Sequence, residues 1–188
     1  LRGLKAGYSV PIWLILWKIT HRLDVCHEMR ASMGNLDLSA AMKDGMRRLA
    51  SGFCILSARD QAGARYAMTA SSVTSVSDTP ASLLVCVNQG TSMAQAMGQS
   101  DRFCINILSQ GQQDLSVSCA TGDQGETRFA LGQWEEDTTC KLPYLPSAQA
   151  VFFCQQDKVF AYGTHNIVIG KIVKVIVPCD DVTPLVYV

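Results

Sequence analysis

The hydrophobic and polar positions along the chain follow two different periods, and the change comes near residue 52. Between residues 35 and 52, apolar side chains recur at steps of three and four, at Leu38, Met42, Met46 and Leu49. Charged residues lie opposite or beside them. This spacing predicts an amphipathic helix over residues 35–52. Asp37 or Ser39 can cap its start, and Gly52 can end it.

After residue 52 the pattern is one of short strands with two short helices between them. Strands are predicted at residues 53–58, 67–80, 82–88, 102–108, 150–163 and 165–177, and another begins at residue 184. Helices are predicted at residues 91–100 and 109–120, and loops at 121–146. Most linkers are too short for parallel crossovers, which need roughly a dozen residues. The chain is therefore predicted to be mainly β, with an antiparallel sheet closed into a barrel and short flanking helices.

The charge balance argues against one broad class of partner. The 188 residues include 16 basic and 16 acidic side chains, with no block of like charge and no basic stripe. Binding to nucleic acid through phosphate neutralisation is therefore not expected. The hydrophobic share of 48% is enough to give one globular domain a core.

The cysteines bear on the redox environment and on metal binding. None of the eight forms a C-x-x-C pair, and several lie in apolar runs such as "LLVCVN" and "RFCINIL". They are predicted to be buried, reduced thiols, which fits a cytoplasmic protein better than a secreted disulfide scaffold. His21 and His27 flank Cys26, but no second ligand cluster follows at a metal-like spacing. No metal site is predicted.

Residues 1–35 are interpreted as an N-terminal extension, and residues 36–188 as the domain. The extension contains the run "VPIWLILWK", which is shorter than the span of about 20 apolar residues that a bilayer requires. No membrane association is expected. Two interpretations of the extension stay open, an artefact of cloning or of the start site, and an arm that packs on the domain or on another copy.

The stretch "AMTASSVTSVSDTP", residues 67–80, is rich in small hydroxyl side chains and carries no charge before Asp78. On one continuous strand, Thr69, Ser71, Ser75 and Ser77 would share a face. Such a face lets a flat ligand approach the backbone. Hydroxyls and backbone N–H groups can then bind ring carbonyls, ring nitrogens and phosphate oxygens. The alternative is the polar outer face of a barrel strand.

Several ordered motifs carry a resemblance to a known family. "AAMKDGMRRLASGFCILSA", "RYAMTASSVTSVSDTPASLLVCVNQGTS", "RFCINIL" and "GTHNIVIGKIVKV" together span most of residues 38–188. They resemble the flavin reductases that supply reduced flavin to two-component monooxygenases, such as the reductase component of 4-hydroxyphenylacetate 3-monooxygenase. The resemblance implies an FMN-binding split barrel, usually a homodimer. It also implies oxidation of NADH or NADPH and reduction of FMN or FAD, on behalf of a monooxygenase partner.

The resemblance also implies which residues contact the flavin. Those expected beside the isoalloxazine ring are Met68, Thr69, Ala70, Ser71 and Ser72. Those expected toward the ribityl chain and the phosphate are Ser75, Val76, Ser77, Asn88, Thr91 and Ser92. Phe103 and Asn106 are expected in the same cleft, and Arg128 and Phe129 match a basic–aromatic pair. Ala67 departs from the glycine that often precedes "MTA" in the family, and residues 132–149 match it weakly.

His165 is the candidate catalytic residue, because the resemblance places it on the nicotinamide side. Hydride transfer from nicotinamide to flavin needs alignment of the two rings and no protein nucleophile. A strand-end histidine bonded to backbone is the open alternative for His165. At the level of the whole protein, the alternative is an FMN-binding electron carrier or sensor without rapid NAD(P)H turnover. No G-x-S-x-G elbow is present, which disfavours a serine hydrolase.

Overall fold

The computed structural model describes residues 37–121, 125–178 and 183–187, and the predicted extension over residues 1–35 lies outside them. The chain divides into two compact units, Leu1–Met46 and Arg47–Val188. In the first unit the described structure is one helix, α2 (Leu38–Met46). The Asp37 carboxylate caps it by accepting a hydrogen bond from the Ser39 backbone N–H at 2.9 Å.

Helix α2 is shorter than the predicted helix over residues 35–52. It ends at Met46, because the chain then turns and enters a short strand, β1 (Ser51–Gly52), which pairs with β11 (Val186–Tyr187). Gly52 therefore lies in a strand and does not end the helix. The predicted strand that begins at residue 184 is present as β11.

The second unit is built on one antiparallel sheet of seven strands. These are β2 (Cys54–Arg59), β3 (Arg65–Ala70), β4 (Thr74–Asp78), β5 (Ala81–Asn88), β6 (Arg102–Ile107), β9 (Ala150–Tyr162) and β10 (His165–Ile176). Their order in the sheet is β3-β2-β6-β9-β10-β5-β4. Strands β3 and β4 lie at opposite edges although only residues 71–73 separate them.

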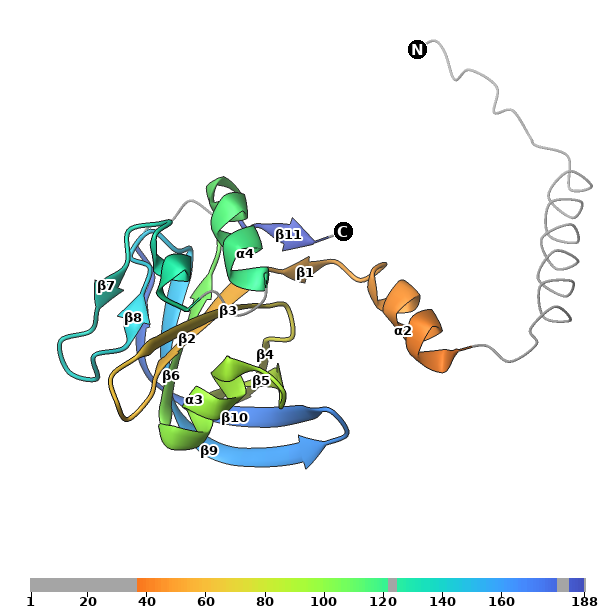
Figure 1. Cartoon of the computed structure of the whole chain (residues 1–188), viewed down its shortest axis with the longest axis horizontal. Helices are drawn as coiled ribbons and strands as arrows, with labels where there is room; N and C mark the ends of the chain where they lie inside the picture. Colours follow the sequence, from red (N-terminus) through yellow and green to blue (C-terminus); the bar gives the residue numbers. More distant parts are fainter. Residues whose placement is uncertain (1–36, 122–124, 179–182, 188) are drawn as a thin grey trace, which may run out of the picture. The chain divides into compact units, whose positions relative to one another are not determined.

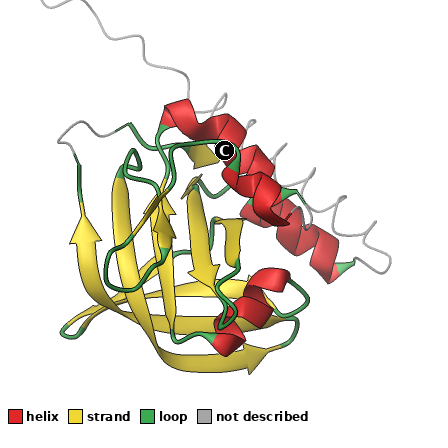
Figure 2. Ribbon diagram, turned by 60° about the vertical axis from the view of Figure 1, so that its left-hand side comes forward, coloured by secondary structure: helices red, strands yellow, loops and turns green. Residues whose placement is uncertain are grey.

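This strand order requires the sheet to curl on itself. In a flat sheet of seven strands the two edges would lie roughly 29 Å apart, at about 4.8 Å for each step. The chain from Ala70 to Thr74 can span at most about 14 Å. The edges must therefore approach each other, which gives a barrel split between β3 and β4 (Figure 1, Figure 2). The predicted mainly β fold with an antiparallel split barrel is confirmed.

The hydroxyl-rich stretch is two strands, and the prediction of one continuous strand over residues 67–80 was wrong. Strand β3 ends at Ala70 and β4 begins at Thr74, on the other edge of the split. The Ser72 hydroxyl bridges the gap: it accepts a hydrogen bond from the Cys86 N–H at 3.2 Å and donates to the Cys86 carbonyl at 3.1 Å. A side chain thus takes the place of a backbone partner at the end of β5.

The shared face predicted for Thr69, Ser71, Ser75 and Ser77 is lost for the same reason. The Thr69 hydroxyl lies on the outer side of the sheet, where it donates to the Ser116 carbonyl at 2.6 Å. Within β4 the register shifts between Ser75 and Ser77, which indicates a β-bulge. A bulge breaks the alternation on which the prediction of one face depended.

Two hydrophobic clusters cover the two faces of the central strands. In β6, Phe103 and Ile105 point into the inner cluster, whereas Cys104 points into the outer one. The outer cluster is closed by α4 (Gln113–Ala120), the 3₁₀ helix η2 (Gly125–Phe129), and the hairpin of β7 (Glu135–Glu136) and β8 (Pro143–Tyr144). A second 3₁₀ helix, η1 (Gln110–Gln112), immediately precedes α4. Residues 121–146, predicted as loops, thus contain short elements. Helix α3 (Ser92–Gln99) packs on the inner cluster through Met93 and Met97.

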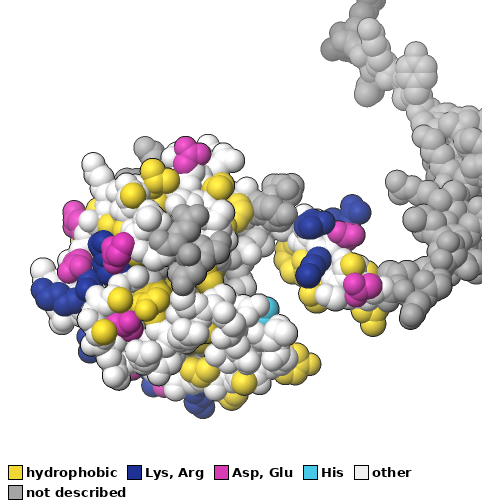
Figure 3. Space-filling view, viewed as in Figure 1, with side chains coloured by type: hydrophobic (Ala, Val, Ile, Leu, Met, Phe, Trp, Pro, Cys, Tyr) yellow, Lys and Arg dark blue, Asp and Glu magenta, His cyan; other side chains and the backbone are white. Residues whose placement is uncertain are grey.

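The surface charges and the cysteines of the described residues bear on the partners and cofactors that the protein can bind. Basic and acidic side chains are intermixed on the face shown in Figure 3. Cys54, Cys104, Cys119 and Cys154 are buried free thiols, as the sequence predicts, whereas Cys86 and Cys140 are only partly buried. Cys26 and Cys179 lie outside the described residues. Within the described residues, no group of three or more His, Cys, Asp or Glu side chains could hold a metal ion. None of the helices in this part of the chain is long and apolar enough to cross a membrane.

Gly170 in β10 is the tightest glycine in the barrel, and its substitution gives a first prediction. A Cβ atom added there would lie 2.5 Å from Cζ of the buried Phe103 ring and 3.0 Å from Cβ of Cys154. We expect Gly170→Ala to lower the free energy of unfolding by about 1–3 kcal/mol, because the core would be overpacked. Urea denaturation measures the change.

Gly98 in α3 provides the matched control. A Cβ atom at Gly98 meets no atom within 4 Å. We expect Gly98→Ala to be neutral or stabilising by up to about 1 kcal/mol, because alanine is the better helix former. Equal stability of the native protein and Gly170→Ala would contradict the packing described for Phe103.

Candidate functional site

One cavity gathers several of the residues that the sequence singles out. Its volume is about 380 Å³, which is within the range of small-molecule sites. Strand β3, the turn into α3, the end of α4 and η2 form its walls. The lining residues are Met68, Gly90, Thr91, Ser92, Met93, Gln95, Cys119, Ala120, Thr121 and Arg128.

The first turn of α3 opens onto this cavity. Thr91 is the N-cap: its hydroxyl accepts a hydrogen bond from the Ala94 N–H at 3.2 Å and donates to the Asn88 carbonyl at 2.7 Å. The Asn88 side chain fixes the preceding turn by accepting from the Gly90 N–H at 2.9 Å. The helix start therefore presents backbone N–H groups and the positive end of the helix dipole beside the Ser92 hydroxyl. Such a helix start favours an anion.

Arg128 supplies a fixed positive charge to the same cavity. Its side chain is buried, and its guanidinium donates hydrogen bonds to the Ala67 carbonyl and, at 2.7 Å, to the Thr121 carbonyl. Among the described residues that line the cavity, Arg128 carries the only formal charge. Because two backbone carbonyls hold the guanidinium, little further ordering is needed when an anion binds.

The remaining walls of the cavity are apolar or uncharged. Met68 and Met93 provide flexible, polarisable surface. Burial raises the pKa of the Cys119 thiol to about 11, and the nearby Arg128 opposes this shift. Cys119 is therefore protonated at neutral pH and acts as an apolar wall rather than as a nucleophile. The cavity as a whole suits a ligand with an apolar body and an anionic end.

His165 lies beside the turn that leads into this cavity. It begins β10 and pairs directly with Asn88 of β5. Its side chain is exposed, and Nδ1 lies 2.8 Å from the Thr164 hydroxyl. Its carbonyl accepts a hydrogen bond from Nε2 of Gln89 at 3.2 Å. The imidazole is thus close in the fold to the Asn88–Ser92 turn, without being part of the cavity lining.

Comparison with known proteins decides the family. The model of the "Flavin reductase like domain" family matches residues 46–188, well over half of the chain. The chain belongs to this family. An FMN reductase (NADH), RutF, of Pseudomonas syringae is 36% identical over 135 residues, covering 72% of this chain and 75% of that protein. The NADH:riboflavin 5'-phosphate oxidoreductase of Streptomyces pristinaespiralis is 35% identical over 135 residues, with 72% and 76% covered.

Solved structures agree with this assignment to the flavin reductase family. BorF, the flavin reductase component of a bacterial two-component tryptophan halogenase, matches with a TM-score of 0.72 and 26% identity over 79% of this chain and 92% of BorF. The flavin reductase PheA2 matches with a TM-score of 0.67 and 27% identity over 79% and 92%. The resemblance derived from the sequence motifs is therefore confirmed.

Four of the residues assigned to flavin by the resemblance are brought together in the cavity: Met68, Thr91, Ser92 and Arg128. Asn88 and His165 lie next to it, at the turn before α3. Phe129 lies behind Arg128, where it stacks edge-on against Trp134 with ring centroids 4.8 Å apart. These positions follow from the packing of α3, α4 and η2 against β3.

Phe103 and Asn106 are not brought to the cavity, contrary to the position expected for them. Phe103 is fully buried in the inner cluster. The Asn106 amide is also fully buried; it donates to the Ile55 carbonyl at 3.0 Å and accepts from the Leu145 N–H at 2.8 Å. Asn106 ties the segment after β8 to the sheet. Both residues hold the barrel together.

The other hydroxyl-stretch residues are divided between different surroundings. Ala70 is buried in the inner cluster, and Thr69 bonds to α4. Ser71 and Ser72 lie in the crossing between β3 and β4, and Ser75, Val76 and Ser77 are exposed on β4. None of these residues is among those that line the cavity described above.

Sequence reasoning missed six of the lining residues: Gly90, Met93, Gln95, Cys119, Ala120 and Thr121. Gly90 lies within the "VNQGTS" motif and Met93 and Gln95 follow it, so the capped start of α3 could have indicated them. Cys119, Ala120 and Thr121 lie at the C-terminal end of α4, which contains no sequence motif. Only the tertiary contact between α4 and β3 brings them to the cavity.

Proposed function

We propose that this chain is an NADH-dependent flavin reductase that binds the flavin in the cavity between β3, α3, α4 and η2. The single observation that carries the site is that the α3 N-terminus and the Arg128 guanidinium line the same cavity as the apolar side chains of Met68 and Met93. FMN has an anionic phosphate and a flat ring system, so this donor set fits it. FMN or FAD is the flavin and NADH, or NADPH, the co-substrate.

The protein's contribution to the reaction is binding and alignment. The bound flavin supplies the chemistry by accepting hydride from the nicotinamide. Thr91, Ser92 and Arg128 hold the phosphate, and Met68 packs beside the ring system. His165 orients the nicotinamide from the adjacent turn. Alignment to near-attack distance provides much of the rate that such an enzyme needs.

Steady-state oxidation of NADH and NADPH, each with and without added FMN or FAD, tests this function. We expect NADH oxidation that depends on added flavin, because relatives named as FMN reductases (NADH) are 36% and 37% identical to this chain over the 135 and 131 residues that align. A protein that binds FMN tightly but turns over neither nucleotide would be a carrier or sensor, which would overturn the proposal.

The role of His165 gives a second prediction. We expect His165→Ala to slow flavin reduction by NADH roughly 2- to 10-fold, the value of one neutral hydrogen bond, and to leave FMN affinity nearly unchanged. The rate of flavin reduction in a single turnover at saturating FMN is the measurement. If His165 only ties down the strand end, stability and flavin affinity would fall together, and the rate for each bound flavin would be preserved.

The proposed assembly is a homodimer that delivers reduced flavin to a monooxygenase component. The "VFFCQQ" stretch cannot supply the surface for it, because Val151, Phe153 and Cys154 are buried within the chain itself, and "PIWLILW" lies outside the described residues. The end of the β9–β10 hairpin supports a dimer instead, since Val159, Phe160 and Tyr162 are half or more exposed.

Sedimentation of the protein across a range of concentrations gives the third prediction. We expect a dimer at micromolar concentration, and Phe160→Ser to shift the population toward monomer while FMN still binds. A native protein that sediments as a monomer at all concentrations would contradict the homodimer.

The cytoplasmic location inferred from the reduced cysteines stays a prediction, which fractionation of the source cells would test.

A further inference from the structure

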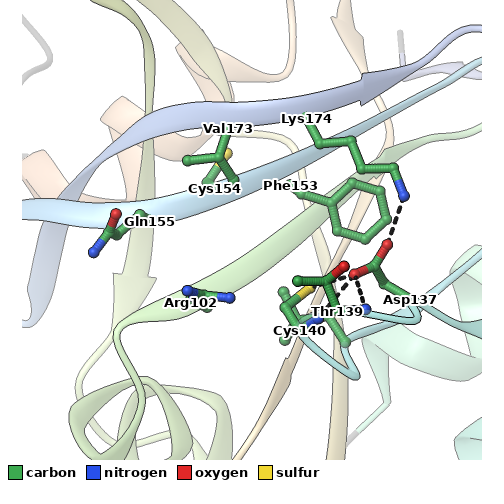
Figure 4. Close-up of a pocket in the computed structure, with 10 residues that line it drawn as sticks. Arg102, Asp137, Thr139, Cys140, Phe153, Cys154, Gln155, Val173 and Lys174 are labelled. Atoms are coloured by element: carbon green, nitrogen blue, oxygen red, sulfur yellow. Dashed lines mark hydrogen bonds and ion pairs between the residues drawn. The ribbon is translucent and has the colours of Figure 1, made fainter.

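A second cavity, of about 290 Å³, lies where β6, β9 and β10 meet the segment between β7 and β8. Figure 4 shows its side chains. It shares no lining residue with the first cavity. Its size is near the lower limit of small-molecule sites, at about 300 Å³. The proposed flavin reductase function leaves it without a role.

The floor of this cavity is apolar and rigid. Leu142, Phe153 and Cys154 are almost fully buried, so each shows only a small face to the cavity. Val173 of β10 is exposed at its rim. These side chains belong to paired strands and to the outer cluster, which fixes their positions. A compact apolar group that binds here would move from water to an apolar surface, which is favourable. Because the side chains of the floor are already fixed, binding would not have to order them.

The negative charge of Asp137, at one side of the cavity, is already paired within the protein. The buried Asp137 carboxylate accepts from Nζ of Lys174 at 2.5 Å, from the Thr139 N–H at 3.0 Å and from the Cys140 N–H at 2.9 Å. Nζ of Lys174 also lies 4.9 Å from the centre of the Phe153 ring. Asp137 and Lys174 therefore neutralise each other.

Arg102 is the remaining charge. It lies across the cavity from Asp137 in Figure 4. Among the described residues, no side chain or carbonyl forms a hydrogen bond or an ion pair with its guanidinium. The lining thus carries one uncompensated positive charge beside an apolar floor. A guanidinium matches a carboxylate through two parallel hydrogen bonds.

We propose that this cavity binds a small monocarboxylate with an apolar body about the size of a benzene ring. The carboxylate pairs with Arg102, and the body packs on Leu142, Phe153 and Val173. Dicarboxylates bind less well, because Lys174 is held by Asp137 and offers no second cation. Free amines are excluded by the positive potential. The site is separate from flavin binding, so ligand and FMN bind together.

Benzoate is the probe, and the full chain is titrated in the presence of saturating FMN. Calorimetry gives the affinity, and methyl NMR shifts of Leu142 and Val173 report the location. We expect one benzoate for each chain, and an affinity at least tenfold lower for the neutral benzamide, because a charge-assisted hydrogen bond is lost. No binding of benzoate at millimolar concentration, or displacement of benzoate by FMN, would overturn the proposal.

Three variants test whether benzoate binds in this cavity and pairs with Arg102. Arg102→Gln should weaken benzoate at least tenfold, and Thr139→Trp should block the cavity from an exposed position. Lys158→Gln removes an exposed charge outside the cavity and should change nothing. All three should keep native FMN reduction. Equal benzoate affinity in Arg102→Gln and the native protein would refute the site. So would an affinity that falls as protein concentration rises, because a second copy would then cover the cavity.

Discussion

FMN should bind at least about 100-fold more weakly to Ser92→Asp than to the native protein, whereas the fold should be unaffected. Ser92 is the first residue of α3 and lines the cavity beside Thr91. In the proposed binding mode, a carboxylate there would meet the FMN phosphate in a partly desolvated site. Like charges brought together in an interface cost several kcal/mol, and about 3 kcal/mol corresponds to a factor of about 100.

The same substitution should not harm the helix. An acidic residue in the first turn interacts favourably with the helix dipole, by about 0.3–1 kcal/mol. Urea denaturation of apo Ser92→Asp should therefore show native or slightly higher stability. Stability and FMN affinity are expected to change in opposite directions, which separates loss of a ligand contact from loss of structure.

Riboflavin and Ser92→Asn are the controls for this experiment. Riboflavin has no phosphate, so Ser92→Asp should bind it with nearly native affinity. Ser92→Asn adds bulk without charge and should weaken FMN only slightly. Fluorescence titration of each flavin gives the affinities. If FMN affinity were unchanged in Ser92→Asp, or if riboflavin lost as much as FMN, the phosphate would lie elsewhere.

The strands could be predicted from the sequence wherever they contain long runs of apolar residues. Strand β6 and the β9–β10 hairpin have long apolar runs, and the structure has strands at the predicted positions. The break between Ala70 and Thr74 was not predictable from local pattern. It depends on closure of the barrel and on the bond between Ser72 and Cys86, which pair residues distant in sequence. A run of small hydroxyl residues looks the same with or without that break.

The candidate site was predictable to the extent that its residues lie in local motifs. The family resemblance assigned Thr91 and Ser92 to the site, and the sequence signature of a helix cap independently placed them at the start of a helix. Asn106 was expected in the flavin cleft because the sequence does not distinguish two roles of a polar residue in an apolar strand. Such a residue can bind a ligand or form hydrogen bonds within the core. Three of Asn106's partners, Ile55, Ser57 and Leu145, come from other segments, and Leu145 is 39 positions away. Cys119 was missed because helix–strand packing alone brings it to the cavity.

Asp137→Ala should lower the free energy of unfolding at neutral pH by about 3 kcal/mol. The carboxylate is buried, and its removal leaves the Thr139 and Cys140 N–H groups without their acceptor and Lys174 without its ion pair. A buried donor without a partner costs about 1–3 kcal/mol. Glu126→Ala is the control, because the Glu126 carboxylate pairs with Arg65 but is mostly exposed. A surface pair contributes about 0–1 kcal/mol.

The contribution of Asp137 should also depend on pH in a defined direction. Its hydrogen bonds with Lys174 and with backbone N–H groups hold the pKa of this carboxyl well below its usual range. A depressed pKa in the folded state means that the stabilisation is fully present above the pKa of the unfolded chain, about 3.9. It is lost progressively as the pH falls below that value. Urea denaturation at pH 7 and pH 3 should therefore show a large difference between native protein and Asp137→Ala at pH 7, and a smaller one at pH 3. A difference that stays constant between the two pH values would show that the charge of Asp137 does not stabilise the fold.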